Sequence, residues 1–358
     1  MRMYFGLKEK VKLSKITLIL GVLPQLNKVK LRQCKRNLQF IMTLQELRKA
    51  FDRLSHPETL LDAFEVLNFY NEFYLRATNF QREENPKNHI EDEARLLLQM
   101  MLSKTLHLKN IIEGVNFTTT NGITLNNIVD PTIVASIVRN VYETTGMFNL
   151  IFRINKLGDE RIIAYNLWVI SGLKYRQRFA NIITQEKNKA KIEKEQKTID
   201  DYIQQIENTE LYKRLNEKNK NKIHNQIKQK EYFIHFKGDD VIISNWATLY
   251  LTMGAKKEFF ENIYTFFSFS THPSNVAVFQ FRDMYLPESK GFIGMTLFNL
   301  QYYFMLGAIF IADYITLFPS SINIFNSMPL LNQIIINFNN TFARRDEFLI
   351  NDSYKALG

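Results

Sequence analysis

The chain of 358 residues has a single cysteine, Cys34, and few helix-breaking residues. One cysteine excludes an internal disulfide and a zinc site built from several cysteines, so a disulfide-stapled secreted scaffold is ruled out and a cytoplasmic location is expected. Thirteen glycines and eight prolines favour long helices over many short strands.

Metal and cofactor motifs are also missing. The chain has no His-Glu-x-x-His, Gly-rich phosphate loop or Gly-x-Ser-x-Gly pattern. The histidines are scattered without metal-ligand spacing, at His56, His89, His107, His224, His235 and His272. We therefore expect no bound metal and no cofactor.

The net charge of +10 is concentrated at the N-terminus. Residues 1–41 contain ten lysines and arginines against one acid, Glu9, which leaves the rest of the chain close to neutral. A basic arm for nucleic acid or anionic lipid, a targeting segment and a non-native leader are all compatible with this pattern. We expect an upstream extension from an alternative start, because Met42 opens a well-capped amphipathic helix.

Capping signals precede several apolar stretches with helical periodicity. They predict helices that begin near Met42, Ser55, Asn88, Asp130 and Asp159. The helix after Ser55 should cover residues 56–84, and residues 116–127 should form a polar loop.

These signals predict an all-α fold, a multi-helix bundle with a projecting charged helical hairpin. Residues 42–183 and 232–358 form the two parts of the bundle. Residues 184–231 between them are rich in Lys, Glu, Gln and Asn, with apolar positions too irregular for a sustained heptad seam. We interpret them as solvated helices, and an arm that binds a protein partner or a second copy is the alternative.

A long uncharged stretch lies near the C-terminus. Asp313 is the one charged residue between Lys290 and Arg344, and residues 291–312 are long enough to cross a bilayer. Two prolines and many asparagines in residues 291–342 are unfavourable against lipid. We expect a buried core, and a membrane-acting effector is the alternative.

Arg139 and Glu143 lie four residues apart in an otherwise apolar helix, so their side chains can meet. Arginine before glutamate is the less favourable order for the helix dipole, which makes simple surface stabilisation a weak reason for the pair. A structural ion pair and a functional site are both compatible with this arrangement.

Tyr264, Ser268 and His272 are also spaced by four, and Pro273-Ser274 follows them. If one helix continues to Thr271, these polar groups lie along one face and can line a cleft. A serine before a histidine suggests a nucleophile and base, but no third orienting acid is evident, and a satisfied polar ladder between helices is the alternative.

Together the two clusters resemble an uncharacterised bacterial family of HEPN-like helical proteins, whose pattern is an Arg...Glu helix followed much later by Ser...His-Pro-[Ser/Thr]. The resemblance covers about residues 91–340, with the charged hairpin as an insertion. It implies a helical bundle and a link to bacterial defence or toxin systems, where HEPN proteins often cut RNA. The HEPN ribonuclease motif, Arg-x(4–6)-His, has one formal match, Arg82 to His89, which contains Pro86 and is typical of an interhelical loop.

We therefore expect a cytoplasmic HEPN-like binding or regulatory protein, in bacterial defence, with RNA as its ligand. Tyr264, Ser268 and Ser274 are the expected ligand-binding residues. The competing hypothesis is a metal-independent ribonuclease or toxin that uses Arg139, Glu143 and His272. A membrane effector acting through residues 291–342 is the third.

Overall fold

The computed structural model describes residues 42–82, 88–155, 158–182, 186–272, 274–284 and 290–358. The chain divides into two compact units, Met1–Gln45 and Glu46–Gly358, and the fold below is that of the second. The interpretations of the basic segment, residues 1–41, lie outside the described residues.

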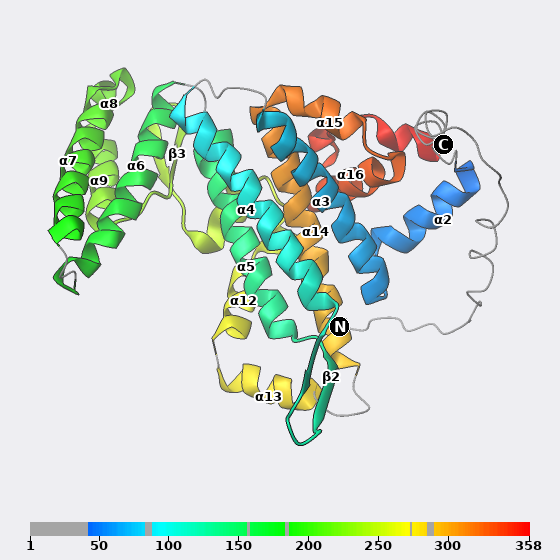
Figure 1. Ribbon diagram of the computed structural model, residues 1–358. Helices are drawn as coiled ribbons and strands as arrows, with labels where there is room; N and C mark the ends of the chain where they lie inside the picture. Colours follow the sequence, from blue (N-terminus) through cyan, green and yellow to red (C-terminus); the bar gives the residue numbers. More distant parts are fainter. Residues whose placement is uncertain (1–41, 83–87, 156–157, 183–185, 273, 285–289) are drawn as a thin grey trace, which may run out of the picture. The chain divides into compact units, whose positions relative to one another are not determined.

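Helix α14 (Gly291–Leu317) is the centre of a helical bundle. It packs along α5 (Pro131–Phe148), α3 (Leu60–Arg82) and α16 (Leu330–Ala343), and α4 (His89–Ile112) packs on α3 and α5 (Figure 1). Aromatic and aliphatic side chains of these helices form one continuous core. The all-α prediction is confirmed at this level.

The uncharged stretch supplies the central helix of this core. Among the described residues, α14 is the one helix that is long and apolar enough to cross a membrane. Every residue from Tyr303 to Tyr314 is buried. The Tyr70 hydroxyl on α3 donates a hydrogen bond of 2.8 Å to the backbone oxygen of Phe304, so α14 is surrounded by protein on the α3 side as well.

Two of the predicted helix starts are confirmed in their capping contacts. The Asn88 side chain accepts a hydrogen bond of 2.9 Å from the Glu91 backbone N–H at the start of α4. The Asp130 carboxylate accepts one of 2.8 Å from the Thr132 N–H at the start of α5. Such contacts satisfy backbone donors that a helix leaves unpaired in its first turn.

The start of the second helix was predicted wrongly. Helix α2 (Leu44–Ser55) ends at Ser55, and α3 begins at Leu60. Thr59 is the N-cap, because its hydroxyl accepts a hydrogen bond of 3.1 Å from the Asp62 N–H. Pro57 disfavours helical backbone at the residue before it, which explains why the helix starts later than the Ser55 box indicated.

The predicted polar loop at residues 116–127 is wrong, because most of it is a β-hairpin. Strands β1 (Val115–Thr118) and β2 (Thr124–Ile128) pair antiparallel around a turn with Gly122 at φ 85°. Asn-Gly between two short β-prone runs is a strong hairpin signal. A second hairpin joins β3 (Ile234–Lys237) to β4 (Asp240–Ile243).

The charged segment is helical and packs against its neighbours. Helix α7 (Glu186–Asn208) lies along α6 (Asp159–Arg176), and α9 (Glu217–Gln229) contacts α6 and β4 (Figure 1). The sparse isoleucines and leucines of the segment share a second apolar cluster with α6 and the β3–β4 hairpin. The segment therefore packs on α6 through a shared second core, which differs from the expected pair of solvated helices.

Short elements complete the fold. They are α8 (Glu210–Arg214), α10 (Leu249–Thr252), α11 (Lys257–Phe260), α12 (Ile263–Thr271), α13 (Asn275–Met284), α15 (Ile322–Asn326), the π-helical η1 (Asn149–Ile154) and the 3-10 turns η2 (Gln177–Ile182), η3 (Trp246–Thr248), η4 (Pro319–Ser321), η5 (Asp346–Phe348) and η6 (Ser353–Leu357).

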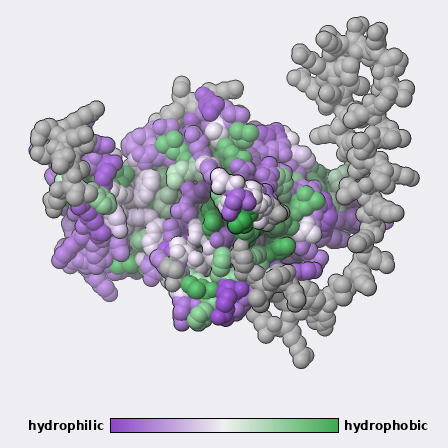
Figure 2. Space-filling view, turned by 60° about the horizontal axis from the view of Figure 1, so that its bottom comes forward, coloured by the Kyte–Doolittle hydropathy of each residue, from purple (hydrophilic) through white to green (hydrophobic). Residues whose placement is uncertain are grey.

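Apolar side chains are exposed at the end of the bundle where β2 and α13 lie. Figure 2 turns this end toward the viewer and shows hydrophobic surface between hydrophilic patches. The exposed side chains on the β1–β2 hairpin and on α13 include Phe117, Ile123, Leu125, Val278 and Phe279.

Candidate functional site

The predicted pair of Arg139 and Glu143 forms on α5. The Arg139 Nε donates to the Glu143 Oε1 at 3.1 Å, and the side chains are 20% and 24% exposed. The pair is therefore partly exposed. Its burial is intermediate between that of an exposed surface ion pair and that of a fully desolvated one.

Arg139 also contacts Tyr264 of α12, 125 residues further along the chain. Its Nη2 donates to the Tyr264 hydroxyl at 2.8 Å, and its guanidinium carbon lies 4.8 Å from the centre of the Tyr264 ring. This joins the two clusters that the sequence singled out. Burial raises the pKa of the Tyr264 hydroxyl, and the hydrogen bond from Arg139 opposes that rise.

An aromatic layer surrounds this contact. The ring of Trp246, in η3, stacks on Tyr264 with centroids 6.4 Å apart and an angle of 11°, and Tyr142 of α5 approaches Tyr264 to 5.7 Å. Trp246, Tyr264 and Arg139 are partly exposed. We call Arg139, Glu143, Trp246 and Tyr264 the Arg139 cluster.

The sequence missed Trp246 as a member of the Arg139 cluster. It lies 18 positions before Tyr264 and 107 after Arg139, so no local spacing connects them. The Tyr142 hydroxyl fixes η3 by donating to the Trp246 backbone oxygen at 2.9 Å. Burial raises the pKa of the Tyr142 hydroxyl further above neutral pH, so the group remains a hydrogen-bond donor.

The other predicted site residues do not join this cluster. The Ser268 hydroxyl donates to the Tyr264 backbone oxygen at 2.8 Å, within α12. His272 follows the last residue of α12 and is exposed, eight residues beyond Tyr264, or roughly 12 Å along the helix axis. Ser274 accepts a hydrogen bond of 3.2 Å from the Ala277 N–H at the start of α13.

The far end of α12 faces a separate shallow pocket. It has a volume of about 320 Å³ and is lined by Thr132 of α5, by Ser270 and Thr271 of α12 and by residues of α13. Ser136 on α5 contacts Thr271 across the helix pair at 3.5 Å. Hydroxyl groups therefore continue the polar contact between α5 and α12 away from the Arg139 cluster.

Within the described ranges, no three His, Cys, Asp or Glu side chains gather as metal ligands would. The formal HEPN-type match, Arg82 to His89, is divided between two helices, because Arg82 ends α3 and His89 begins α4. The arrangement that remains is a partly exposed guanidinium beside two aromatic rings. It is suited to hold an anion or a planar group.

The part of the chain that contains the Arg139 cluster is similar to a known protein family. Residues 122–284 match a family of unknown function, DUF5677. No curated protein and no solved structure matches the chain. The matched stretch runs from the β1–β2 hairpin to the end of α13 and includes all four residues of the Arg139 cluster, so this part of the chain is similar to an uncharacterised family.

Proposed function

We propose that the protein is an RNA-binding regulatory module and that single-stranded RNA binds at the Arg139 cluster. The observation that supports this is the position of the Arg139 guanidinium, held by Glu143 and Tyr264 yet still 20% exposed. The resemblance of the sequence to HEPN-like proteins favours RNA as the ligand and bacterial defence, in the cytoplasm, as the setting.

The cluster has the two groups that unpaired RNA requires. A guanidinium presents parallel donors to a phosphate, and no hydrogen bond occupies the Arg139 Nη1 in the described part of the chain. Partly exposed rings such as Trp246 give bases a stacking surface that tolerates any sequence. Double-stranded RNA keeps its bases stacked and paired, so we expect it to bind more weakly.

Arg139→Lys tests the proposal. An ammonium keeps the charge but not the forked donors, so we expect a near-native melting temperature and about tenfold weaker binding of a fluorescent single-stranded RNA, equivalent to ~1.4 kcal/mol. Anisotropy at low salt measures the affinity. Arg282→Lys is the matched control, because Arg282 on α13 also pairs with a carboxylate and lies over a ring, that of Phe279 at 5.3 Å.

Both variants retain residues 1–41, so the strongly basic N-terminal segment is the same in each comparison. Equal RNA affinity of Arg139→Lys and the unaltered protein contradicts the proposal, as does an absence of binding at low salt. Electrophoresis of the same RNA after incubation tests the ribonuclease alternative: cleavage lost in His272→Ala would favour an enzyme over a binding module.

A further inference from the structure

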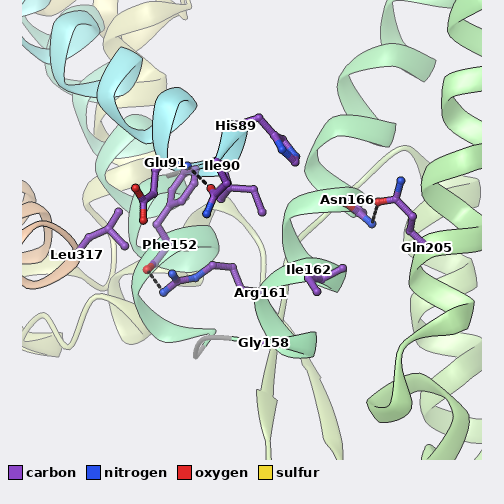
Figure 3. A pocket seen from close by; sticks show the side chains of 11 residues that line it. His89, Ile90, Glu91, Phe152, Gly158, Arg161, Ile162, Asn166, Gln205 and Leu317 are labelled. Carbon is purple, nitrogen blue, oxygen red and sulfur yellow. Dashed lines mark hydrogen bonds between the residues drawn. The ribbon is translucent and has the colours of Figure 1, made fainter. Parts of the chain in front are cut away.

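A second pocket lies between the bundle and the charged segment. It has a volume of about 420 Å³ and lies between the first turn of α4, the π-helical η1, α6 and α7 (Figure 3). This volume falls within the range of about 300–1,000 Å³ that is typical of pockets for small organic molecules. The pocket shares no lining residue with the Arg139 cluster.

Arg161 of α6 supplies a cation to this pocket. Its Nη2 donates to the Phe152 backbone oxygen at 2.7 Å, while its Nε is buried with no hydrogen-bond partner among the described residues. Across those residues no carboxylate lies within ion-pairing distance of Arg161. Burial lowers the pKa of Arg161, and the nearby charge of Glu91 partly restores it.

The first turn of α4 faces the same space. Asn88, His89, Ile90 and Glu91 all line the pocket, and the Asn88 side chain caps the Glu91 N–H. The backbone N–H groups of the first two helical residues have no partner inside a helix, and the positive end of the helix dipole favours an anion. The single acid Glu91 opposes a highly charged anion.

Asn166 and Gln205 form the opposite side. Asn166 is 2% exposed, and its Nδ2 donates to the Gln205 Oε1 at 3.3 Å across the gap between α6 and α7. The Asn166 Oδ1 accepts no hydrogen bond in the described part of the chain. Figure 3 shows this amide pair on one side of the pocket, with Arg161 and Glu91 on the other.

Apolar side chains separate the two polar sides. Ile90 of α4, Phe152 of η1 and Ile162 of α6 line the space between them. A matching ligand therefore has a single small anionic group at one end, a flat or apolar body, and an edge with both donors and acceptors at the other. Primary amides recognise the donor and acceptor edge of a nucleobase, adenine in particular.

We propose that this pocket binds a nucleoside monophosphate. Arg161 and the first turn of α4 hold the phosphate, Ile90, Phe152 and Ile162 contact the sugar and the base, and Asn166 with Gln205 reads the base edge. Inorganic phosphate leaves most of the volume empty, and a triphosphate brings additional negative charge near Glu91. Because α4 and α7 supply opposite sides, the ligand also joins the bundle to the charged segment.

Calorimetric titration of the full chain with AMP tests the proposal, with adenosine and inorganic phosphate as partial ligands. We expect AMP to bind at least tenfold more tightly than either. Arg161→Gln should weaken AMP at least tenfold and leave adenosine nearly unchanged, and Gln205→Leu should weaken both AMP and adenosine. Arg178→Gln, at an exposed arginine in η2 over the Tyr175 ring, is the matched control and should bind AMP normally.

Three results would overturn the proposal: no AMP binding at millimolar concentration, equal affinity for phosphate and AMP, or normal AMP binding by Arg161→Gln. Circular dichroism of each variant establishes whether it folds. If Arg161→Gln does not fold, Gln205→Leu still tests the proposal, because Gln205 is exposed. RNA binding by Arg161→Gln should equal that of the unaltered protein. The proposal that the pocket binds AMP and the proposal that the Arg139 cluster binds RNA can therefore be contradicted independently.

Discussion

A single Nη2 atom of Arg344 donates to both carboxylate oxygens of Asp313, at 2.9 and 2.8 Å. The two side chains are 1% and 3% exposed. Asp313 is the single charged residue between Lys290 and Arg344. The charge inside this stretch and the charge at its C-terminal end therefore neutralise each other. The Asn149 amide donates to the same carboxylate at 2.8 Å, which ties α14, the end of α16 and η1 together.

Asp313→Asn should destabilise the protein by about 3–5 kcal/mol, because it leaves the Arg344 guanidinium buried without a counter-charge. Urea unfolding followed by circular dichroism measures the loss. Asp283→Asn is the control: its ion pair with Arg282 is 63% and 69% exposed and should contribute at most about 1 kcal/mol. Adding Arg344→Met to Asp313→Asn should recover part of the loss, and an unchanged or larger loss in the double variant would contradict this account.

Glu143→Gln should cost far less than Asp313→Asn. The Arg139 pair is partly exposed, and Arg139 keeps its hydrogen bond to Tyr264 when Glu143 loses its charge. We expect a loss of about 1 kcal/mol or less in the same urea experiment. A loss near that of Asp313→Asn would mean that the cluster is desolvated and serves the fold, which would weaken the proposal that it binds RNA.

Gly307→Ala tests the close approach of α14 to α3. An added Cβ would lie 3.0 Å from two ring carbons of Tyr70 and 3.2 Å from the Tyr74 hydroxyl oxygen. Tyr70 is held by its hydrogen bond to Phe304, so we expect overpacking and a loss of about 1–3 kcal/mol.

Gly294→Ala, on the same helix, is the matched control. Its added Cβ meets no atom within 4 Å, and alanine favours a helix over glycine by up to about 1 kcal/mol. Thermal unfolding should therefore show opposite shifts for the two glycines. A lower melting temperature for both would point to a general requirement for glycine in α14 and against the specific contact with Tyr70.

The parts of the fold that the sequence predicts are those determined by neighbouring residues. Asn88 and Asp130 act within three residues of themselves, so their caps follow directly from the sequence. Arg139 and Tyr264 were each identified, but their contact joins residues 125 positions apart and depends on how α12 packs on α5. The pairing of Asp313 with Arg344 also depends on how distant segments pack, so the sequence did not predict it, although it showed that few charges lie near them.

Some errors had local causes. The Asn121-Gly122 turn signal lies among uncharged polar residues, whose composition favours a loop, and the strands on either side of it nevertheless pair. For His272, the four-residue spacing from Ser268 indicated a shared helical face. The helix ends at Thr271, and the His272 backbone is extended, with φ −103° and ψ 136°, so the spacing no longer determines where its side chain lies.

The last prediction concerns the membrane hypothesis, which rests on the uncharged stretch. Residues 303–314 of α14 are buried among α3, α5 and α16, and withdrawing them into lipid would expose the Asp313–Arg344 pair and break the hydrogen bond between Tyr70 and Phe304. We therefore expect the full chain to remain in the supernatant after high-speed centrifugation of a detergent-free lysate. Recovery in the membrane pellet would contradict this expectation. Phe117→Ser with Ile123→Ser then tests the exposed β1–β2 hairpin, because release from the pellet would assign binding to it. Retention would leave the basic residues 1–41 and α14 as the remaining causes, and binding through α14 would require the bundle to open.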